Sequence, residues 1–445
     1  MSALVRIWAG AMTLAAPGLR LMLRVRLSRG KEAPGRLPER HGIDRTPRPP
    51  GRLLWLHAAS VGETTSVLPV LALLLEKAPD LTVLFSTCTV TSARLLGQRL
   101  TPEQSARVLH RFVPLDVPAW AARFLDHWRP DAGAFLESEL WPNLLTACRA
   151  RNIPLMLLNA RLSPRSFDRW RRLPGLAGEL LGGFALVHAR SEADAARLRA
   201  LGARRVEAPG DLKFAAPPLP SDPDEQARIR SLVKDRPTWL AASTHPGEEA
   251  LVFAVHRALV ERYPDVLTVL APRHPERGTA IAAEAAPLPV TRRGLGEGPP
   301  AGPGIWLADT LGELGLWYRL APVAFVGRSL IAPGGGQNPL EPARLGCAVV
   351  VGPHTGNFEA HVALLREAEA LTVVRDAGEL AGFVADMLAA PAVSRAMGAR
   401  AEAALQRQGH LVEETAEAVL TFLTAPACSE RDRLGREASQ PQRRG

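Results

Sequence analysis

Short apolar runs alternate with helix-length amphipathic stretches almost throughout this chain. Such alternation is typical of βαβ units, in which helices join parallel strands and cover the sheet. The first series of apolar runs is RLLWLHA, LTVLFST, AGAFLE, IPLMLLN and FALVHAR, and the second is PTWLAAS, DVLTVLAP, GIWLAD, PVAFVG, CAVVVGP and LTVVRD. The sequence therefore predicts an α/β protein with two parallel sheets.

A proline-rich segment separates the two series. From Phe214 to Glu225 the sequence reads FAAPPLPSDPDE, and so many prolines continue neither a helix nor a strand. A chain of 445 residues has room for two or three domains. We expect two Rossmann-like domains, residues 36–216 and 224–426, facing each other across a cleft, with ligands at the carboxyl ends of the strands. We expect residues 427–445 to form a polar, disordered tail.

Charge and composition limit the classes of partner. The formal net charge is +9, which favours nucleic acid, an anionic membrane or a phosphorylated substrate. Aromatic residues make up only 5% of the chain and do not interleave with arginines, so we expect no nucleic acid partner. The four cysteines form no C-x-x-C pair and have no histidine nearby in sequence, which predicts a reducing compartment and no metal cluster.

The N-terminal segment, residues 1–35, combines apolar and basic residues. The uncharged stretch from Ile7 to Leu19 contains Pro17 and is shorter than the ~20 residues of a membrane span. The basic residues that follow lie among leucines and suit an amphipathic segment in the headgroup layer of an anionic leaflet; they are Arg20, Arg24, Arg26, Arg29 and Lys31. We expect this segment to bind the membrane surface. The alternative is an ordinary amphipathic helix packed on the body of the protein.

A glycine-rich loop stands before a predicted helix in the second domain. Gly334 to Gly336 are followed by NPLEPARLG, with Asn338 as N-cap and Pro339 at the first helical position. The free N–H groups of such a helix start favour phosphate. Glu341 would either bind ribose hydroxyls or be no more than a favourable first-turn acid.

Two other loops of the second domain carry groups suited to a nucleotide. VLAPRHPER ends a strand with Arg273, His274 and Arg277, which can bind a phosphate or a base edge, or form a solvated basic loop. DTLGELGLW begins a helix with Gly312 and Glu313 close to its start. The chain has neither G-x-x-x-x-G-K-[ST] nor G-x-G-x-x-G, which argues against an ATPase and a dehydrogenase.

Acidic residues and one lysine follow strands of the first domain. Glu63 comes after RLLWLHAASVG, Glu137 and Glu139 come after AGAFL, and Lys213 lies just before the linker. Because an unpaired buried carboxylate is costly, acids at strand ends are solvated, paired or functional. We expect Glu63 to be functional, with Glu137, Glu139 and Lys213 as further candidates.

The motifs SVGE, ESELWPN, NARLSPRS, GDLKF, STHPGEE, PRHPER, DTLGEL, NPLEPA and GPHTGNF follow one another along the chain. In this series the chain resembles the 3-deoxy-D-manno-octulosonic acid (Kdo) transferases of Gram-negative lipid A biosynthesis. The resemblance implies a two-domain fold of the GT-B type. It also implies transfer of Kdo from CMP-Kdo to a lipid A precursor, lipid IVA, at the cytoplasmic face of the inner membrane.

The resemblance assigns roles to particular residues. Glu63 matches the general base, and Glu137 and Lys213 match residues that stabilise the transition state. The positions that match CMP contacts are Pro272, Arg273, Leu311, Gly312, Glu313, Asn338, Pro339, Leu340 and Glu341. No carboxylate cluster near the glycine-rich loop suits a metal ion, so we expect neither a metal nor a cofactor.

Two positions depart from the family's usual pattern. Arg328 stands where a second glycine is more typical, and Gln337 stands where histidine is common. Either change would affect donor affinity more than the type of reaction.

The expected reaction is an inverting displacement through an oxocarbenium-like state, with Glu63 as base and the second domain taking up the phosphate charge. Because a fold does not fix a function, a transferase or epimerase acting on another nucleotide sugar is an alternative. A basic membrane-surface protein without catalysis is another.

Overall fold

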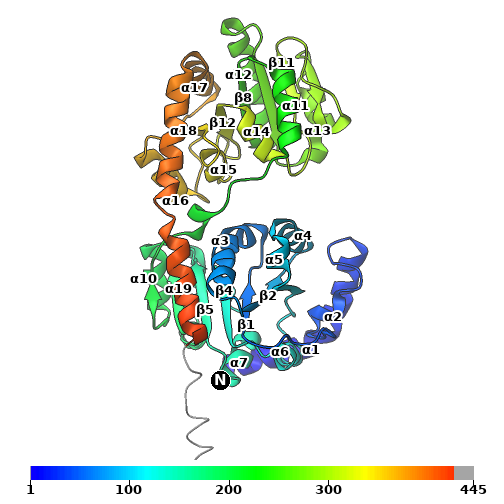
Figure 1. Ribbon diagram of the computed structural model, residues 1–445, viewed down its shortest axis with the longest axis vertical. Helices are drawn as coiled ribbons and strands as arrows, with labels where there is room; N and C mark the ends of the chain where they lie inside the picture. Colours follow the sequence, from blue (N-terminus) through cyan, green and yellow to red (C-terminus); the bar gives the residue numbers. More distant parts are fainter. Residues whose placement is uncertain (1, 425–445) are drawn as a thin grey trace, which may run out of the picture. The chain divides into compact units, whose positions relative to one another are not determined.

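The computed structural model describes residues 2–424, and the chain divides into two compact units. Within the described residues, the first unit comprises 2–217 and 409–424, and the second comprises Pro218–Gln408. Each unit is a parallel sheet covered by helices (Figure 1). The predicted α/β class with two parallel sheets is therefore confirmed.

The first sheet has the strand order β3-β2-β1-β4-β5-β6-β7, and all its pairs are parallel. Its strands are β1 Leu53–His57, β2 Thr82–Thr87, β3 Val108–Phe112, β4 Ala132–Leu136, β5 Leu155–Ala160, β6 Leu186–Ala189 and β7 Val206–Glu207. The direction of strand addition reverses between β1 and β4. In open α/β sheets, ligands bind beyond the carboxyl ends of the strands at such a reversal.

Helices cover both faces of this sheet. They are α1 Ala3–Ser28, α2 Leu37–Arg40, α3 Val61–Lys77, α4 Val90–Arg99, α5 Pro102–Ser105, α6 Pro118–Trp128, α7 Pro142–Ala150, α8 Pro164–Trp170, α9 Pro174–Leu181, α10 Glu192–Ala200 and α19 His410–Thr424, with a 3₁₀ turn η1 Leu212–Ala215. Every residue of β1 is buried. Leu53 and Trp55 join the core on one face, and Leu54 and Leu56 join the core on the other, because successive strand side chains alternate in direction.

The C-terminal helix α19 belongs to the first unit, which corrects the predicted boundary that placed residues up to 426 in the second domain. Its apolar residues Leu411, Ala416, Val419 and Leu423 lie in the same core cluster as the buried face of α3. Figure 1 shows α19, in red, alongside the first sheet. Burying these side chains away from water stabilises the packing of α19 on the first unit. The local sequence of the helix does not indicate which of the two sheets it packs against. The predicted tail, residues 427–445, lies outside the described residues.

The second sheet has the order β10-β11-β9-β8-β12-β13-β14 and is also parallel. Its strands are β8 Thr238–Thr244, β9 Leu267–Pro272, β10 Val290–Arg292, β11 Gly304–Leu307, β12 Val323–Val326, β13 Ala348–Val351 and β14 Leu371–Val373. The helices are α11 Pro223–Val233, α12 Glu248–Arg262, α13 Gly278–Glu284, α14 Leu314–Leu320, α15 Leu340–Ala343, α16 Glu359–Glu367, α17 Ala377–Ala389 and α18 Pro391–Gln406, with 3₁₀ turns η2 Pro275–Arg277 and η3 Arg293–Leu295. In this second sheet, the direction of strand addition reverses between β8 and β12.

The N-terminal segment forms one helix, α1, that continues through Pro17. Only Val5 and Leu23 of this helix are buried. Trp8 Nε1 donates to Asp116 Oδ2 at 2.8 Å and so ties the helix to the body of the first unit. By length and composition, no single helix of the described part of the chain could cross a membrane, although one bent helix pair, residues 377–389 with 391–423, passes that test jointly.

Candidate active site

Glu63 lies in the first turn of α3, directly after the loop that leaves β1. Its Oε2 accepts from the backbone N–H of Ala59 and its Oε1 from the hydroxyl of Ser60, both at 2.7 Å. The Ser60 hydroxyl in turn accepts from the Glu63 N–H at 3.3 Å. The Ser60 side chain thus caps the helix, and its hydroxyl together with the Ala59 N–H fixes the carboxylate at the start of the helix.

Burial shapes the acid–base behaviour of Glu63. The residue is only 7% exposed, and burial raises the pKa of its carboxyl above the ordinary value, because the ionised form loses hydration. The Ser60 hydrogen bond acts in the opposite direction, and the negative charges of Glu137 and Glu139 raise this pKa further. The carboxyl makes no ion pair with another described residue. An unpaired carboxylate of raised pKa at a strand end is suited to accept a proton.

Glu137 and Lys213 form an ion pair. Lys213 Nζ lies 2.5 Å from Glu137 Oε1, and both side chains are about one-fifth exposed. Glu137 directly follows β4 and has a φ of 56°, a left-handed conformation that is unusual for glutamate. The structure thus brings together two of the predicted catalytic residues, on the β4 side of the reversal in the first sheet.

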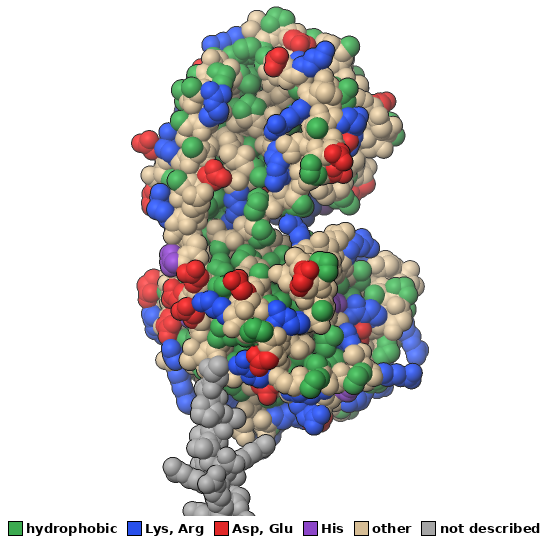
Figure 2. All heavy atoms as spheres, in the orientation of Figure 1, with side chains coloured by type: hydrophobic (Ala, Val, Ile, Leu, Met, Phe, Trp, Pro, Cys, Tyr) green, Lys and Arg blue, Asp and Glu red, His purple; other side chains and the backbone are tan. Residues whose placement is uncertain are grey.

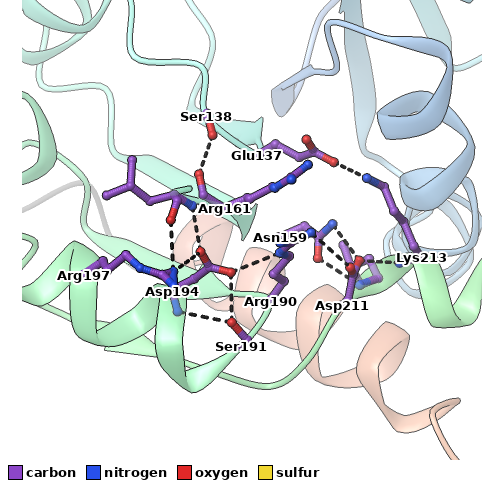
Figure 3. Close-up of polar contacts among 12 residues, drawn as sticks. Glu137, Ser138, Asn159, Arg161, Arg190, Ser191, Asp194, Arg197, Asp211 and Lys213 are labelled. Carbon is purple, nitrogen blue, oxygen red and sulfur yellow. Dashed lines mark hydrogen bonds and ion pairs between the residues drawn. The ribbon is translucent and has the colours of Figure 1, made fainter. Parts of the chain in front are cut away.

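Asn159 holds the Lys213 loop against the end of β5. Its side chain donates to Asp211 Oδ1 at 3.0 Å and accepts from the Leu212 N–H at 2.9 Å. Asp211 Oδ1 also accepts from the backbone N–H of Lys213 at 2.9 Å. Figure 3 shows these contacts beside the Glu137–Lys213 pair. Asn159 is buried and also left-handed, with a φ of 51°, so it positions the lysine rather than forming part of the predicted reacting groups.

A second polar cluster supports the neighbouring loop. Asp194 accepts from the Leu162 N–H at 2.8 Å and from the side chains of Arg190 and Ser191 at 3.0 and 2.9 Å. The hydroxyl of Ser138 donates to the carbonyl of Arg161, which ties the loop after β4 to the loop after β5 (Figure 3). The sequence analysis did not indicate Asp194, whose role depends on partners from distant segments.

In the second unit, four of the predicted nucleotide residues line one small recess. Pro272 ends β9 and Arg273 follows it, and Leu311 and Gly312 lie in the loop after β11. They line a cavity of about 60 Å³ together with Trp317. Leu311 is 80% exposed, so its apolar side chain is available for contact with a ring. The Arg273 guanidinium is exposed as well and makes no ion pair with a described residue.

Glu313, by contrast, is already paired. Arg293 Nη2 lies 2.7 Å from Glu313 Oε1, and the Thr310 hydroxyl donates to Oε2 at 2.5 Å. Burial raises the pKa of Glu313, but the Arg293 and Thr310 hydrogen bonds outweigh it and hold the pKa below its ordinary value. Glu313 is therefore anionic and tied to Arg293, a residue that sequence reasoning did not single out.

The glycine-rich loop approaches protein backbone closely. Gly334, Gly335 and Gly336 have φ values of 40°, 108° and 78°, which L-residues with side chains rarely adopt. A Cβ on Gly334 would lie 2.5 Å from the His354 side chain, and one on Gly335 would lie 2.5 Å from Asn357. The glycines are therefore required by the packing of this loop against residues 354–357, independently of any ligand.

The helix after this loop differs slightly from prediction. It begins at Leu340, one residue later than predicted, with Pro339 preceding it, and it is only four residues long. Asn338 Oδ1 nevertheless accepts from the Leu340 N–H at 3.1 Å, and Asn338 Nδ2 lies 3.4 Å from Glu341 Oε1. Burial raises the pKa of Glu341. A helix this short has a weak dipole, so its N–H groups would be the main attraction for an anion.

Arg328 has a φ of 57° and is exposed. Its backbone N–H donates to Glu248 Oε2 at 2.6 Å, and the same carboxylate accepts from the N–H groups of Ser329 and Leu330. Buried Glu248 therefore holds this turn in the left-handed form where glycine would be favoured.

A larger hollow lies elsewhere on the second unit. It has a volume of about 560 Å³ and is lined by residues such as Arg230, Lys234 and Arg319, at the amino end of β8. None of the predicted site residues lines it.

The family comparison covers much of the chain. Residues 35–216 match the family model of 3-deoxy-D-manno-octulosonic acid transferases. A probable mitochondrial 3-deoxy-D-manno-octulosonic acid transferase of Arabidopsis thaliana is 38% identical over 81% of this chain and 82% of its own length. The chain belongs to the 3-deoxy-D-manno-octulosonic acid transferase family. The 3-deoxy-D-manno-octulosonic acid transferase of Haemophilus influenzae is 35% identical over 77% of this chain and 81% of its own length. That of Bordetella pertussis is 36% identical over 85% of this chain and 89% of its own length.

Solved structures support the fold of this Kdo transferase family member. A UDP-GlcNAc 2-epimerase from Neisseria meningitidis has a TM-score of 0.57 and 14% identity over 83% of this chain and all of its own. A glycosyltransferase from Rickettsia africae has a TM-score of 0.56 and 13% identity over 85% of this chain and all of its own. At this identity they establish the two-sheet fold alone.

Proposed function

We propose that this Kdo transferase family member transfers Kdo from CMP-Kdo to lipid IVA, a lipid A precursor, with inversion at the anomeric carbon. The observation that supports the proposal most is the state of Glu63, a buried, capped carboxyl of raised pKa beyond the end of β1. A base is most effective when its pKa lies near the working pH, and burial moves a carboxyl in that direction.

In the proposed reaction, an acceptor hydroxyl oxygen bonds to the anomeric carbon of Kdo while the bond to the phosphate oxygen breaks. Glu63 takes the hydroxyl proton, and CMP leaves with the bonding electron pair. Positive charge develops on the sugar in the transition state. Glu137 would stabilise that charge, and Lys213, paired with it at 2.5 Å, would keep it ionised and aligned.

The donor would bind through the second unit. The exposed guanidinium of Arg273 is suited to the phosphate, since guanidinium forks match phosphate oxygens. Leu311 and Gly312 in the same recess would contact the cytidine, and Asn338 to Glu341 would complete the pocket. Since Glu313 is held by Arg293, its backbone rather than its carboxylate would face the nucleotide.

The first helix would anchor the protein to the cytoplasmic face of the inner membrane. Ile7, Leu14 and Leu21 of α1 are 66%, 84% and 62% exposed, and basic residues share the helix with them. Figure 2 shows basic side chains along the lower edge of the first unit, where Figure 1 places α1. Exposed leucines beside arginines are typical of helices that lie in the headgroup layer of anionic lipids.

The test is a transfer assay with the purified full chain. The chain is incubated with lipid IVA and either CMP-Kdo or UDP-sugars, and the lipid product is analysed by mass spectrometry while released nucleotide is measured. We expect CMP release and a lipid heavier by Kdo, only with CMP-Kdo. Turnover of a UDP-sugar instead would identify a transferase or epimerase for another nucleotide sugar. Membrane binding without turnover of any donor would show a non-catalytic protein.

A further inference from the structure

Three potential metal ligands meet at the carboxyl ends of neighbouring strands in the first unit. His57 ends β1, Cys88 follows β2, and Glu139 lies in the loop after β4. Because the sheet order is β2-β1-β4, these three strand ends are adjacent. One ligand atom from each residue lies within 4.8 Å of the other two. The sequence analysis found no cysteine–histidine metal motif, because these three residues lie tens of positions apart in the chain and come together only in the folded sheet.

The environment of His57 defines which ring nitrogen is available. The side chain is fully buried, and Nδ1 lies 3.1 Å from the Ser86 carbonyl oxygen and 2.8 Å from the Ser86 hydroxyl. A hydrogen on Nδ1 satisfies the contact with the carbonyl oxygen, which only accepts, whereas the closer Ser86 hydroxyl can either accept from Nδ1 or donate to it. In a neutral ring with the hydrogen on Nδ1, Nε2 has the lone pair that metal-binding imidazoles use.

The Nε2 atom of His57 lies beside a carboxylate. His57 Nε2 is buried and has no hydrogen-bond partner among the described residues, and it faces Glu139 Oε2 at 3.5 Å. Two electron-pair donors face each other favourably only with a proton or a cation between them. Cys88 supplies a thiol sulfur on the same side. The arrangement therefore groups a buried ring nitrogen, a carboxylate and a thiol, and either a proton shared by His57 and Glu139 or a cation would satisfy it.

We propose that His57 Nε2, Cys88 Sγ and a carboxylate oxygen of Glu139 bind a thiophilic divalent cation, with Zn²⁺ as the best match. One nitrogen, one sulfur and one oxygen ligand suit this borderline-soft ion, and three protein ligands leave a fourth position for water or another ligand. Zinc bonds of about 2.0–2.3 Å place tetrahedral ligand atoms about 3.3–3.8 Å apart. The present atoms need to move inward by no more than about 1.5 Å to reach that geometry.

Neighbouring groups already orient two of the ligands. Trp55 Nε1 donates to the Ser86 hydroxyl at 2.8 Å, which fixes the group that holds His57. Trp141 Nε1 donates at 2.5 Å to Glu139 Oε2, the oxygen that faces His57 Nε2, and so orients the carboxylate toward the cluster. Such outer contacts are typical of metal sites. A bound ion would tie together the ends of β1, β2 and β4, from which the loops to Glu63 and Glu137 begin.

The proposal is tested by metal binding, independently of transfer activity. The full chain is stripped with a chelator and titrated with Zn²⁺ against a chromogenic chelator, and separately with Co²⁺ while the absorption spectrum is recorded. We expect one ion per chain and, with Co²⁺, sulfur-to-cobalt charge-transfer bands together with the intense visible bands of a four-coordinate site. Failure of transfer from CMP-Kdo would leave this result unaffected.

Two conservative variants identify the ligands, and a third is the control. Cys88→Ser and Glu139→Gln keep the side-chain size, and each should weaken Zn²⁺ binding by more than about 100-fold, since outer-shell changes alone cost 10–100-fold. Cys148→Ala removes a buried cysteine of the same unit outside the cluster and should leave binding unchanged. Circular dichroism verifies that the variants fold. Absence of stoichiometric binding, or full binding by folded Cys88→Ser, would overturn the proposal.

Discussion

Lys213 Nζ and Glu137 Oε1 lie 2.5 Å apart, although 76 positions separate the residues in the chain. The pair joins the loop after β4 to the turn that precedes the second unit. We expect Lys213→Ala to lower the turnover number with CMP-Kdo by about 10²–10³-fold, the usual effect of removing one electrostatic stabiliser. Steady-state kinetics with purified enzyme measures this change.

A matched control is available for that variant. Lys77 also pairs with a glutamate, Glu417, at 3.0 Å, but both side chains are well exposed. Lys77→Ala should change the turnover number by less than twofold, because exposed pairs contribute little. Equal losses in the two variants would show that Lys213 acts through folding rather than at the site.

Replacing Glu63 by Gln should separate catalysis from stability. The Ser60 cap on the backbone N–H of residue 63 does not involve the side chain that changes, and a Gln side-chain oxygen can still accept from the Ser60 hydroxyl, so the helix start is retained while the proton acceptor is lost. We expect transfer to fall by about 10²–10⁴-fold. Glu76→Gln, an exposed acid on the same helix, should be fully active. A Glu63→Gln enzyme that keeps more than half of the wild-type rate would exclude Glu63 as the base.

The raised pKa of Glu63 also predicts two pH effects. Since only the ionised base accepts a proton, wild-type activity should rise as the pH rises through this pKa. A carboxyl whose folded pKa exceeds its unfolded pKa binds protons more tightly in the folded state, so its contribution to stability falls as the pH rises between the two values. Urea unfolding at several pH values should therefore show Glu63→Gln gaining stability relative to wild type toward neutral pH.

Asn159 should be more costly to replace than another asparagine of the same backbone conformation. Asn159→Ala loses the bonds to Asp211 and Leu212 and leaves buried polar groups unpaired, at about 1–3 kcal/mol, in addition to about 1 kcal/mol of left-handed strain. Asn152 has a φ of 54° but is exposed, so Asn152→Ala should cost the strain alone. Urea unfolding measures both. Equal losses would mean that the Asn159 contacts contribute nothing.

Arg328→Gly should stabilise the second unit. A glycine relieves the strain of a φ of 57°, but it also makes the unfolded chain more flexible, which opposes folding. We expect the free energy of unfolding to rise by about 0.5–1 kcal/mol on balance. Arg366→Gly, within helix α16, should instead cost about 1 kcal/mol. If Arg328 also contacts the donor phosphate, the Michaelis constant for CMP-Kdo rises in the stabilised variant. A lower unfolding midpoint for Arg328→Gly would contradict this account.

Membrane binding by α1 should depend on its exposed apolar residues. Replacing Ile7, Leu14 and Leu21 together by Ser removes apolar surface that is already in water, so the fold should persist. Co-sedimentation with anionic vesicles should fall by at least tenfold, because buried apolar area drives insertion. Leu295→Ser, at a leucine of the second unit that is 64% exposed, is the control. Unchanged sedimentation of the triple variant would exclude α1 as the anchor.

The sequence determined the central strands of both sheets. β1, β2, β4, β5, β6, β8, β9, β11, β12 and β13 each coincide with a predicted apolar run, since strands covered on both faces require continuous apolar residues. The edge strand β14 was also predicted, from the run LTVV. The sequence analysis missed β3, β7 and β10, which are edge strands with partly buried side chains. An edge strand needs no continuous apolar run, so its sequence carries a weak signal.

The sequence also placed Glu63 at a helix start and indicated the loops that carry Glu137, Lys213 and Arg273, because each follows a recognisable strand or motif. Only the tertiary structure decided which side chains meet. It paired Lys213 with Glu137, tied Glu313 to Arg293, joined α19 to the first unit, and grouped His57 with Cys88 and Glu139. Such contacts depend on strand order and on packing between distant segments, and local sequence spacing encodes neither of these.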